Sequence, residues 1–185
     1  NDGDLDLIIS GESGANRFTT IYQNNGTTFD AQSFGLRGER TTSCAWGDYD
    51  GDGDLDVVVS GWNGTFATTV YQNNGATFDA QSFPIAGVTK SSTEWGDYDN
   101  DGDLDLLITG LFYNDASEMN DVATLVYKND GGNFNVQSFP FSGVQNSSGE
   151  WGDYDGDGDL DILITGQDPS DDPIAIIYKN DGVSF

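Results

Sequence analysis

The stretch WGDYDGDGDLDVVVSG, residues 46–61, decides the fold because nearly the same stretch occurs four times. It returns as WGDYDNDGDLDLLITG at residues 95–110 and as WGDYDGDGDLDILITG at residues 151–166, and residues 1–11 read NDGDLDLIISG. Successive copies lie 50, 49 and 56 residues apart. A period of about 50 residues indicates a repeat architecture.

Each repeat predicts four short strands and no helix. In the third repeat a small polar segment at residues 91–96 leads into an Asp-rich loop, and the apolar run Leu104–Thr109 suits a buried strand. A third strand follows at Thr124–Lys128, and a fourth strand carries Phe134 and Phe139. Asn-Gly or Asp-Gly separates these last two strands in all four repeats, which predicts a tight hairpin with positive φ at both central residues.

Four antiparallel strands per period are typical of β-propeller blades rather than of an immunoglobulin-like sandwich, whose strands do not repeat as a unit. The sequence therefore predicts an all-β fold, a β-propeller built of four-stranded antiparallel blades. Residues 1–185 would form a single β-propeller segment of about three and a half blades, because closed propellers contain at least four. We expect further blades of the same chain, or another copy, to complete the ring. The predicted repeats are 1–40 (partial), 41–89, 90–145 and 146–185 (partial).

The charge is lopsided, with 32 Asp and Glu against 6 Lys and Arg, no His, and a net charge of −26. Such a surface repels phosphate, so we expect no nucleic-acid partner. No apolar run approaches the ~18 residues of a membrane span, so we also expect no membrane insertion. The chain is nevertheless rich in aromatic residues, with 4 Trp, 8 Tyr and 11 Phe, which disordered acidic segments lack. The acidic residues therefore need a structural use.

Most of the acidic residues gather in loops of the form D-x-D-x-D-G-x-x-D. Alternate Asp side chains converge only if the chain curls around a point, and Gly at the sixth position permits the turn. Carboxylates at ~4 Å repel one another by about 1 kcal/mol per pair even in water, so a cation is needed. A ligand set of oxygens alone selects a hard ion, and a crowded flexible loop suits Ca²⁺ better than Mg²⁺.

We therefore expect one Ca²⁺ in each of three complete loops. Side-chain ligands are predicted at the first, third, fifth and ninth positions of a loop, and a backbone carbonyl at the seventh. The first repeat retains Asp2 and Asp6, with Asp4 at the backbone position, so its site is expected to be incomplete. The predicted ligands of the complete loops are Asp48, Asp50, Asp52, Asp54 and Asp56; Asp97, Asp99, Asp101, Asp103 and Asp105; and Asp153, Asp155, Asp157, Asp159 and Asp161.

Two other interpretations of the loops fail. An EF-hand begins in the same way but needs a Glu at position twelve and flanking helices, and here that position is Val59, Ile108 or Ile164 in a predicted strand. Asp and Gly as simple turn formers would explain one such loop. They do not explain the same four Asp spacings in three loops.

These residues resemble the VCBS/FG-GAP-like repeat family, which is related to the calcium-binding blades of integrin α-subunit propellers. The resemblance rests on WGDYDGDGDLD, on the apolar strand ending in TG or SG, and on VYKNDG or VYQNNG followed by a Phe. It implies that the Asp loop joins the first two strands of each blade and binds Ca²⁺, and that the protein is secreted. The Phe-Gly and Gly-Ala-Pro signatures of integrin blades are missing, so integrin-like ligand recognition is not implied.

The two faces of such a fold differ in character. Because strands alternate in direction, the Asp loops and hairpins share one face, and the variable segments 61–66, 111–121 and 167–173 share the other, where loops on a rigid scaffold commonly carry binding. We expect a non-catalytic adhesion or recognition module of a secreted or cell-surface protein, with an extracellular protein or glycan ligand. Trp62 could stack on a sugar or pack between blades. The alternatives are a propeller domain of a secreted polysaccharide-active enzyme, with Glu94 and Glu150 as its only candidates, and a purely structural spacer.

Overall fold

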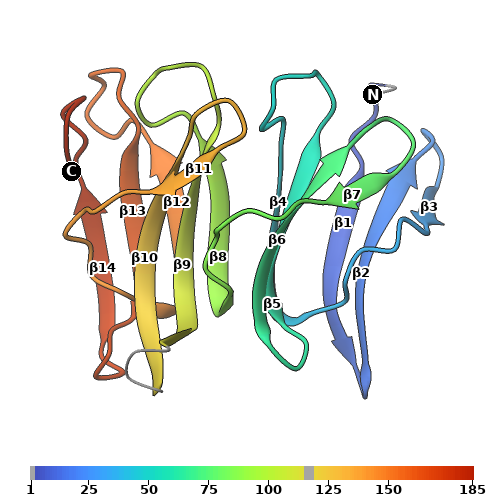
Figure 1. Ribbon diagram of the computed structural model, residues 1–185, viewed down its shortest axis with the longest axis horizontal. Helices are drawn as coiled ribbons and strands as arrows, with labels where there is room; N and C mark the ends of the chain where they lie inside the picture. Colours follow the sequence, from blue (N-terminus) through green and yellow to red (C-terminus); the bar gives the residue numbers. More distant parts are fainter. Residues whose placement is uncertain (1–2, 115–118) are drawn as a thin grey trace.

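The computed structural model describes residues 3–114 and 119–185, and within these ranges the chain is all β (Figure 1). Its strands pair antiparallel with their neighbours in sequence and form four sheets in chain order, two of four strands and two of three. The prediction of helix-free, antiparallel four-stranded sheets is therefore confirmed for the described residues. None of these residues belongs to a helix that could cross a membrane.

Each sheet corresponds to one sequence repeat. The first and second sheets consist of β1 (Leu7–Ser13), β2 (Asn16–Asn24) and β3 (Phe29–Gln32), and of β4 (Arg40–Gly47), β5 (Asp56–Trp62), β6 (Phe66–Asn73) and β7 (Phe78–Ala80). The third and fourth consist of β8 (Val88–Gly96), β9 (Asp105–Asn114), β10 (Met119–Asn129) and β11 (Phe134–Val136), and of β12 (Gln145–Gly152), β13 (Asp161–Gln167) and β14 (Pro173–Tyr178). In the last three sheets the first strand ends at the Gly of WG, and the second begins at the last Asp of the loop.

The predicted extent of two strands in the third repeat is wrong. The fourth strand, β11, ends at Val136, so Phe139 lies beyond it, and its ring packs on Tyr98 with centroids 6.0 Å apart. Phe139 thus contributes a partly buried ring to the core rather than a further strand residue. The segment 111–121 is also less loop-like than predicted, because β9 and β10 both extend into it and pair there.

The hairpins on the Asp-loop face are wider than predicted. Among the turn residues 74–77 of the second sheet only Gly75 has positive φ, at 82°, so the turn is not the two-residue type that requires positive φ twice. Instead the backbone N–H of Asn74 donates to the carbonyl of Thr77 at 3.1 Å, which leaves a four-residue turn. The Asn74 side-chain oxygen accepts the N–H groups of Ala76 and Thr77 at 3.2 and 3.0 Å. The Asn74 side chain thus stabilises the turn by accepting hydrogen bonds from the backbone of the turn itself.

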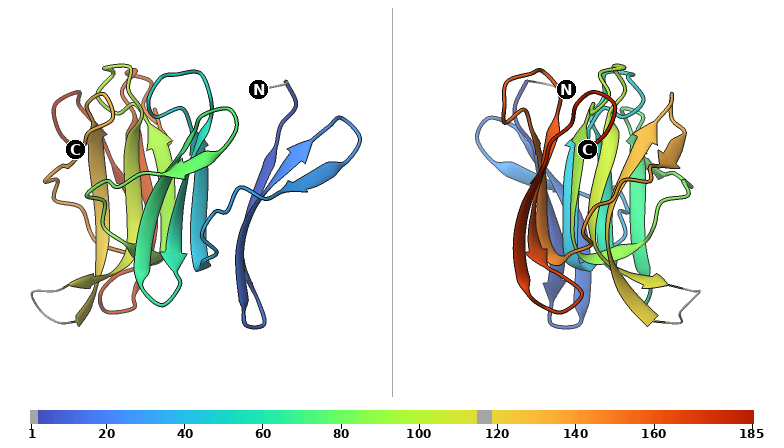
Figure 2. Two further views of the ribbon diagram at one scale, coloured as in Figure 1. Left: turned by 45° about the vertical axis from the view of Figure 1, so that its right-hand side comes forward. Right: turned by 90° about the vertical axis from the view of Figure 1, so that its left-hand side faces the viewer.

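The last three sheets pack face to face (Figure 2). Each of the two interfaces between them contains a stacked ring pair. Tyr49 in the second sheet's Asp loop stacks on Trp95 of the third sheet with centroids 6.2 Å apart and planes 14° apart. Tyr98 and Trp151 form the equivalent pair at 6.1 Å and 7°. Each Trp lies over a Gly of the preceding sheet, where a Cβ would be 2.5 Å from Trp95 or 2.6 Å from Trp151. The WGDY block therefore fixes neighbouring sheets to each other.

The connections separate into two faces, as predicted. The Asp loops β4–β5, β8–β9 and β12–β13 lie at one end of the sheets, together with the hairpins β6–β7 and β10–β11 (Figure 1, top). The connections β5–β6 and β13–β14 lie at the other end. All three Asp loops are thus displayed on one face of the molecule.

Candidate metal centres

The three Asp loops curl in the same way because glycine or asparagine occupies the two positions that need left-handed backbone. In the second sheet Gly51 and Gly53 have φ of 71° and 94°. In the third sheet Asn100, at 59°, replaces the first of these glycines, and Asn is among the few side chains that tolerate this region. The curl points backbone N–H groups inward, so that Gly53 N donates to Asp48 Oδ2 at 3.0 Å. Gly102 and Gly158 donate to Asp97 and Asp153 at 3.0 and 3.1 Å.

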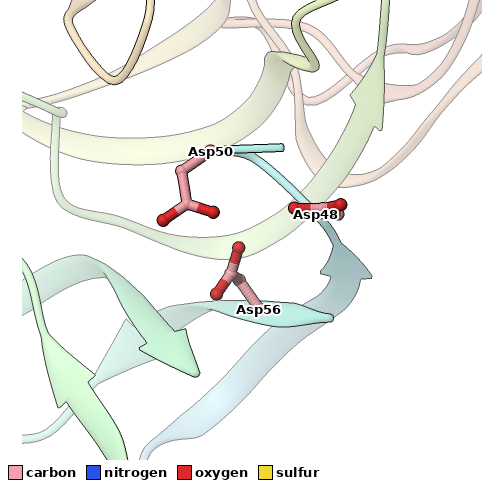
Figure 3. Close-up of side chains that lie close together, drawn as sticks. All are labelled: Asp48, Asp50 and Asp56. Carbon is pink, nitrogen blue, oxygen red and sulfur yellow. The ribbon is translucent and has the colours of Figure 1, made fainter. Parts of the chain in front are cut away.

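Three Asp clusters result, one in each loop. In every cluster three carboxylates offer oxygen atoms that all lie within 4.8 Å of one another. Figure 3 shows the first cluster, in which the side chains point toward a common centre. The clusters are Asp48, Asp50 and Asp56; Asp97, Asp99 and Asp101; and Asp153, Asp155 and Asp161.

The last Asp of each loop is buried and ties the loop to two strands. Asp56 is fully buried, and its two oxygens accept the N–H groups of Tyr49 at 3.1 Å and Asn73 at 2.7 Å. Burial raises the pKa of Asp56 to about 6 and that of Asp105 to about 7, because removal from water penalises the charged form more than these hydrogen bonds favour it. A cation in the cluster would favour the carboxylate form and offset that penalty.

The clusters fit a hard divalent cation by their donor set and by two unsatisfied atoms. All described donors are carboxylate oxygens, which is the ligand chemistry of Ca²⁺ and Mg²⁺. In addition, Asp48 Oδ1 and Asp99 Oδ1 are shielded from solvent and accept no hydrogen bond. A buried carboxylate oxygen without a partner is costly, and a metal ion would satisfy both atoms.

The structure does not bring all of the predicted ligands together. Asp52, Asp105 and Asp157 lie outside their clusters, and the predicted backbone role of Asp54, Asp103 and Asp159 remains a prediction. The Asp103 side chain instead accepts the N–H of Gly131 at 2.9 Å, which joins the loop to its hairpin. In the first repeat Asp2 lies outside the described residues. Asp4 and Asp6 do not belong to a three-residue cluster among the described residues, and Asp6 accepts the N–H of Asn24 at 2.8 Å.

Sequence reasoning missed the residue that follows the Tyr of the YQN or YKN block. In the second sheet this residue is Gln72, whose Nε2 donates to Asp50 Oδ2 at 2.5 Å. In the third sheet it is Lys128, which contacts Asp99 closely and lies 2.9 Å from Asp101 Oδ2. Its equivalent in the fourth repeat, Lys179, contacts Asp155 and lies 3.1 Å from Asp157 Oδ2. The repeated block was the available signal.

The Asn of the same block was also missed, and it links neighbouring sheets. Asn129 is fully buried, and its Nδ2 donates to the carbonyl of Leu104 at 3.1 Å in its own loop and to that of Tyr49 at 2.7 Å in the preceding loop. Asn180 makes the equivalent bond to Tyr98 at 2.8 Å. The Asp loops of the second and third sheets are therefore each held partly by the repeat that follows.

The sequence and the fold were compared with known proteins. Residues 1–59 match the FG-GAP-like repeat family. No curated protein sequence matches the chain. Among solved structures the fold is similar to that of an Agrocybe aegerita lectin, described for its specific recognition of non-reducing terminal N-acetylglucosamine, with a TM-score of 0.56 and 20% identity. The match covers 97% of this chain and 48% of the lectin chain, so this chain spans about half the lectin's length. Residues 1–59 are therefore similar to an FG-GAP-like repeat.

Proposed function

We propose that the chain is a calcium-binding, non-catalytic recognition module, part of a β-propeller, in a secreted or cell-surface protein. The observation that carries this proposal is the occurrence of three equivalent Asp clusters in equivalent loops of successive sheets. Asp48, Asp50 and Asp56 would hold the ion in the second sheet. Asp97, Asp99 and Asp101 would do so in the third sheet, and Asp153, Asp155 and Asp161 in the fourth. A bound Ca²⁺ neutralises the converging carboxylates and fixes the loop between the first two strands of its sheet.

The packing of the sheets supports the propeller. Leu107 and Val126, on the face of the third sheet that receives the fourth, are 1% and 0% exposed. Leu163 and Ile177 take the corresponding places on the fourth sheet and are 43% and 52% exposed. Beside them Gly152 has open space where Gly47 and Gly96 each meet a Trp. This face matches the back of a further repeat of the same kind, which we propose as its partner in a closed ring.

The face opposite the Asp loops is the proposed recognition surface. It carries a hollow of about 420 Å³, within the range of small-ligand pockets. Tyr113 at its edge is 51% exposed and presents an aromatic surface suited to a sugar ring. The hollow lies between the second and third sheets and is lined by Trp62, Gly64, Thr65, Phe66, Gly87, Tyr113 and Asn120.

Trp62 contributes to this surface as a packing residue. The guanidinium groups of Arg17 and Arg40 lie over its ring, 4.5 and 4.0 Å from the centroid. Such cation–π contacts occupy the ring and join the first two sheets. Of the two interpretations of Trp62 from sequence, the contacts favour packing between sheets, which leaves Tyr113 as the aromatic residue available to a ligand.

The recognition role is tested by glycan-array and extracellular-protein binding in calcium and in chelator. We expect calcium-dependent binding that Tyr113→Ala reduces about two- to tenfold, because loss of one stacked ring removes about 0.5–1.5 kcal/mol. The matched control is Phe29→Ala, which removes a similarly exposed ring, 53% exposed, at the opposite end of the molecule. Absence of binding to any glycan or protein would support a spacer, and hydrolysis of a polysaccharide would support an enzyme; either result would refute the recognition role.

A further inference from the structure

The three Asp clusters differ in the charge of the side chain that reaches into them from the neighbouring strand. The position after the Tyr of the repeat block is Gln72 at the end of β6, Lys128 at the end of β10 and Lys179 just after β14. All three side chains contact the second Asp of the loop's alternating series, which is Asp50, Asp99 or Asp155. The geometry is thus the same in each repeat, while the charge delivered to the carboxylates is zero in one repeat and +1 in two.

Each of the two lysines contacts at least one carboxylate that belongs to a cluster. Lys128 Nζ contacts Asp99 and lies 2.9 Å from Asp101 Oδ2, and both Asp residues belong to the third-sheet cluster. Asp130 Oδ1, in the adjacent hairpin, lies 3.7 Å from the same nitrogen. Lys179 Nζ contacts Asp155, which belongs to the fourth-sheet cluster. The ammonium groups therefore neutralise carboxylates that belong to the clusters proposed to hold the metal ion.

Gln72 makes the corresponding contact without a charge. Its amide donates one hydrogen bond to Asp50 Oδ2 at 2.5 Å but adds no positive charge. Carboxylate repulsion is therefore less relieved here than beside a lysine. The second-sheet cluster has the greater electrostatic need for an added cation.

We propose that Lys128 and Lys179 are built-in cations that weaken calcium binding to their own loops and stabilise the calcium-free loops, whereas Gln72 leaves the Asp48–Asp56 loop as the tight site. This inference rests on the proposed calcium binding and adds its regulation. The repeats then fill in sequence as calcium rises, the Gln72 repeat first. Calcium depletion releases the ion first from the lysine repeats, where the ammonium already holds the carboxylates together.

The size of the effect follows from electrostatic repulsion between the ammonium and a divalent ion that share the same carboxylates. A lysine ammonium and a divalent ion a few ångströms apart repel each other. Even when water screens most of this repulsion, it is strong enough to change a dissociation constant about tenfold. We therefore expect the dissociation constants of the lysine and glutamine loops to differ by about tenfold or more.

The test is calcium titration calorimetry of the chain and of charge-exchanged variants. The unaltered protein should show one tight site and two weaker sites. Lys128→Gln combined with Lys179→Gln should tighten the two weak sites about tenfold, and Gln72→Lys should weaken the tight one by a similar factor. Lys90→Gln is the matched control, since it removes the same charge from a lysine that bonds Gln145 at 3.2 Å, away from the Asp loops.

Melting in chelator supplies a second readout with the opposite sign. In chelator, Lys128→Gln should lower the melting temperature although it strengthens calcium binding. Gln72→Lys should raise the melting temperature although it weakens calcium binding. A lysine with a merely structural role would move stability and calcium affinity in the same direction. If all variants and the Lys90→Gln control bind calcium with equal affinity, the proposed effect of the lysines is refuted, while the proposed calcium binding stands. Absence of calcium binding in every protein would overturn the proposed function, and with it this inference.

Discussion

Substitution of Gly96 by Ala tests how the repeats hold one another. A Cβ at Gly96 would lie 2.6 Å from Trp151 Cδ1 and 2.8 Å from its Cγ, distances that real Cβ atoms do not show. Trp151 must therefore move, but it is stacked on Tyr98 with ring planes 7° apart, so the stack is disturbed as well. The contact lies in the interface between the third and fourth sheets, so the substitution should destabilise both sheets.

The magnitude follows from three contributions. Overpacking costs about 1–3 kcal/mol, and partial loss of the aromatic pair costs about 0.5–1.5 kcal/mol. Replacement of a strand Gly by Ala returns about 0.5–1 kcal/mol through the lower entropy of the unfolded chain. The free energy of unfolding should therefore fall by about 2 kcal/mol, which corresponds to about 4–8 °C in melting temperature for a chain of this size.

Gly152→Ala is the matched control, because the same WG dipeptide there has no atom within 4 Å of the added Cβ. Urea unfolding at fixed calcium should show Gly96→Ala destabilised and Gly152→Ala unchanged or slightly more stable. Equal stability of Gly96→Ala and the unaltered protein would show that Trp151 does not lie over Gly96. Equal loss in both variants would show that the glycines matter for backbone reasons rather than for the packing of neighbouring sheets.

Three further predictions concern the polar groups. Asn129→Ala should lower the free energy of unfolding by about 2–3 kcal/mol in urea, because two buried carbonyls lose their donor; the exposed Asn135→Ala, in a nearby strand, should change it little, and equal losses would contradict the cross-sheet role. Burial, with a smaller effect of Glu150, raises the pKa of Glu94 from 4.5 to about 7. The protonated Glu94 carboxyl therefore stabilises the folded state at low pH, and this stabilisation is lost as pH rises from 4.5 through about 7. Urea unfolding in calcium should show the free energy of unfolding fall by about 1–2 kcal/mol over this range, after a discount for solvent screening. Glu94→Gln should not show this fall. Chelation should remove about 4 kcal/mol for three sites that each contribute ~1.4 kcal/mol at ten times the dissociation constant, and equimolar Mg²⁺ should restore little of the melting temperature; an unchanged melting curve would contradict a structural role for calcium.

The part of this structure that was predictable from sequence is the part that repeats with fixed spacing. The alternation of Asp48, Asp50 and Asp56 around glycines dictates a curled loop, and the structure gathers these carboxylates as expected. The apolar run after each loop likewise predicts a central strand, because its residues are too apolar for any other place in a four-stranded sheet.

The features that escaped prediction depend on contacts between segments far apart in sequence. Asn129 bonds Tyr49, 80 residues earlier, and no local pattern indicates that its side chain crosses to another sheet. No local pattern indicates that Lys128 contacts Asp99, because the two residues are 29 positions apart and meet only in the folded repeat. The wide hairpins were mispredicted because Asn-Gly favours a two-residue turn locally, while the Asn side chain of residue 74 stabilises a longer one.

The first strands of the last three sheets contain another feature without a local sequence signal. Their pairing register shifts by a β-bulge, and one residue that is not glycine adopts left-handed φ at the same place in each repeat. These residues, Thr41, Lys90 and Asn146, share no side-chain type that would predict the conformation. Pairing with the second strand on both sides of the bulge imposes it.

The central claim, that the Asp loops hold calcium, is tested most directly by a crystal structure of the protein grown in millimolar calcium, with the ion identified by its anomalous scattering. We predict one Ca²⁺ in each of the three loops, bound by six to eight oxygen atoms at about 2.3–2.6 Å that include those of Asp48, Asp97 and Asp153. Well-ordered loops without an ion at that calcium concentration would contradict the claim.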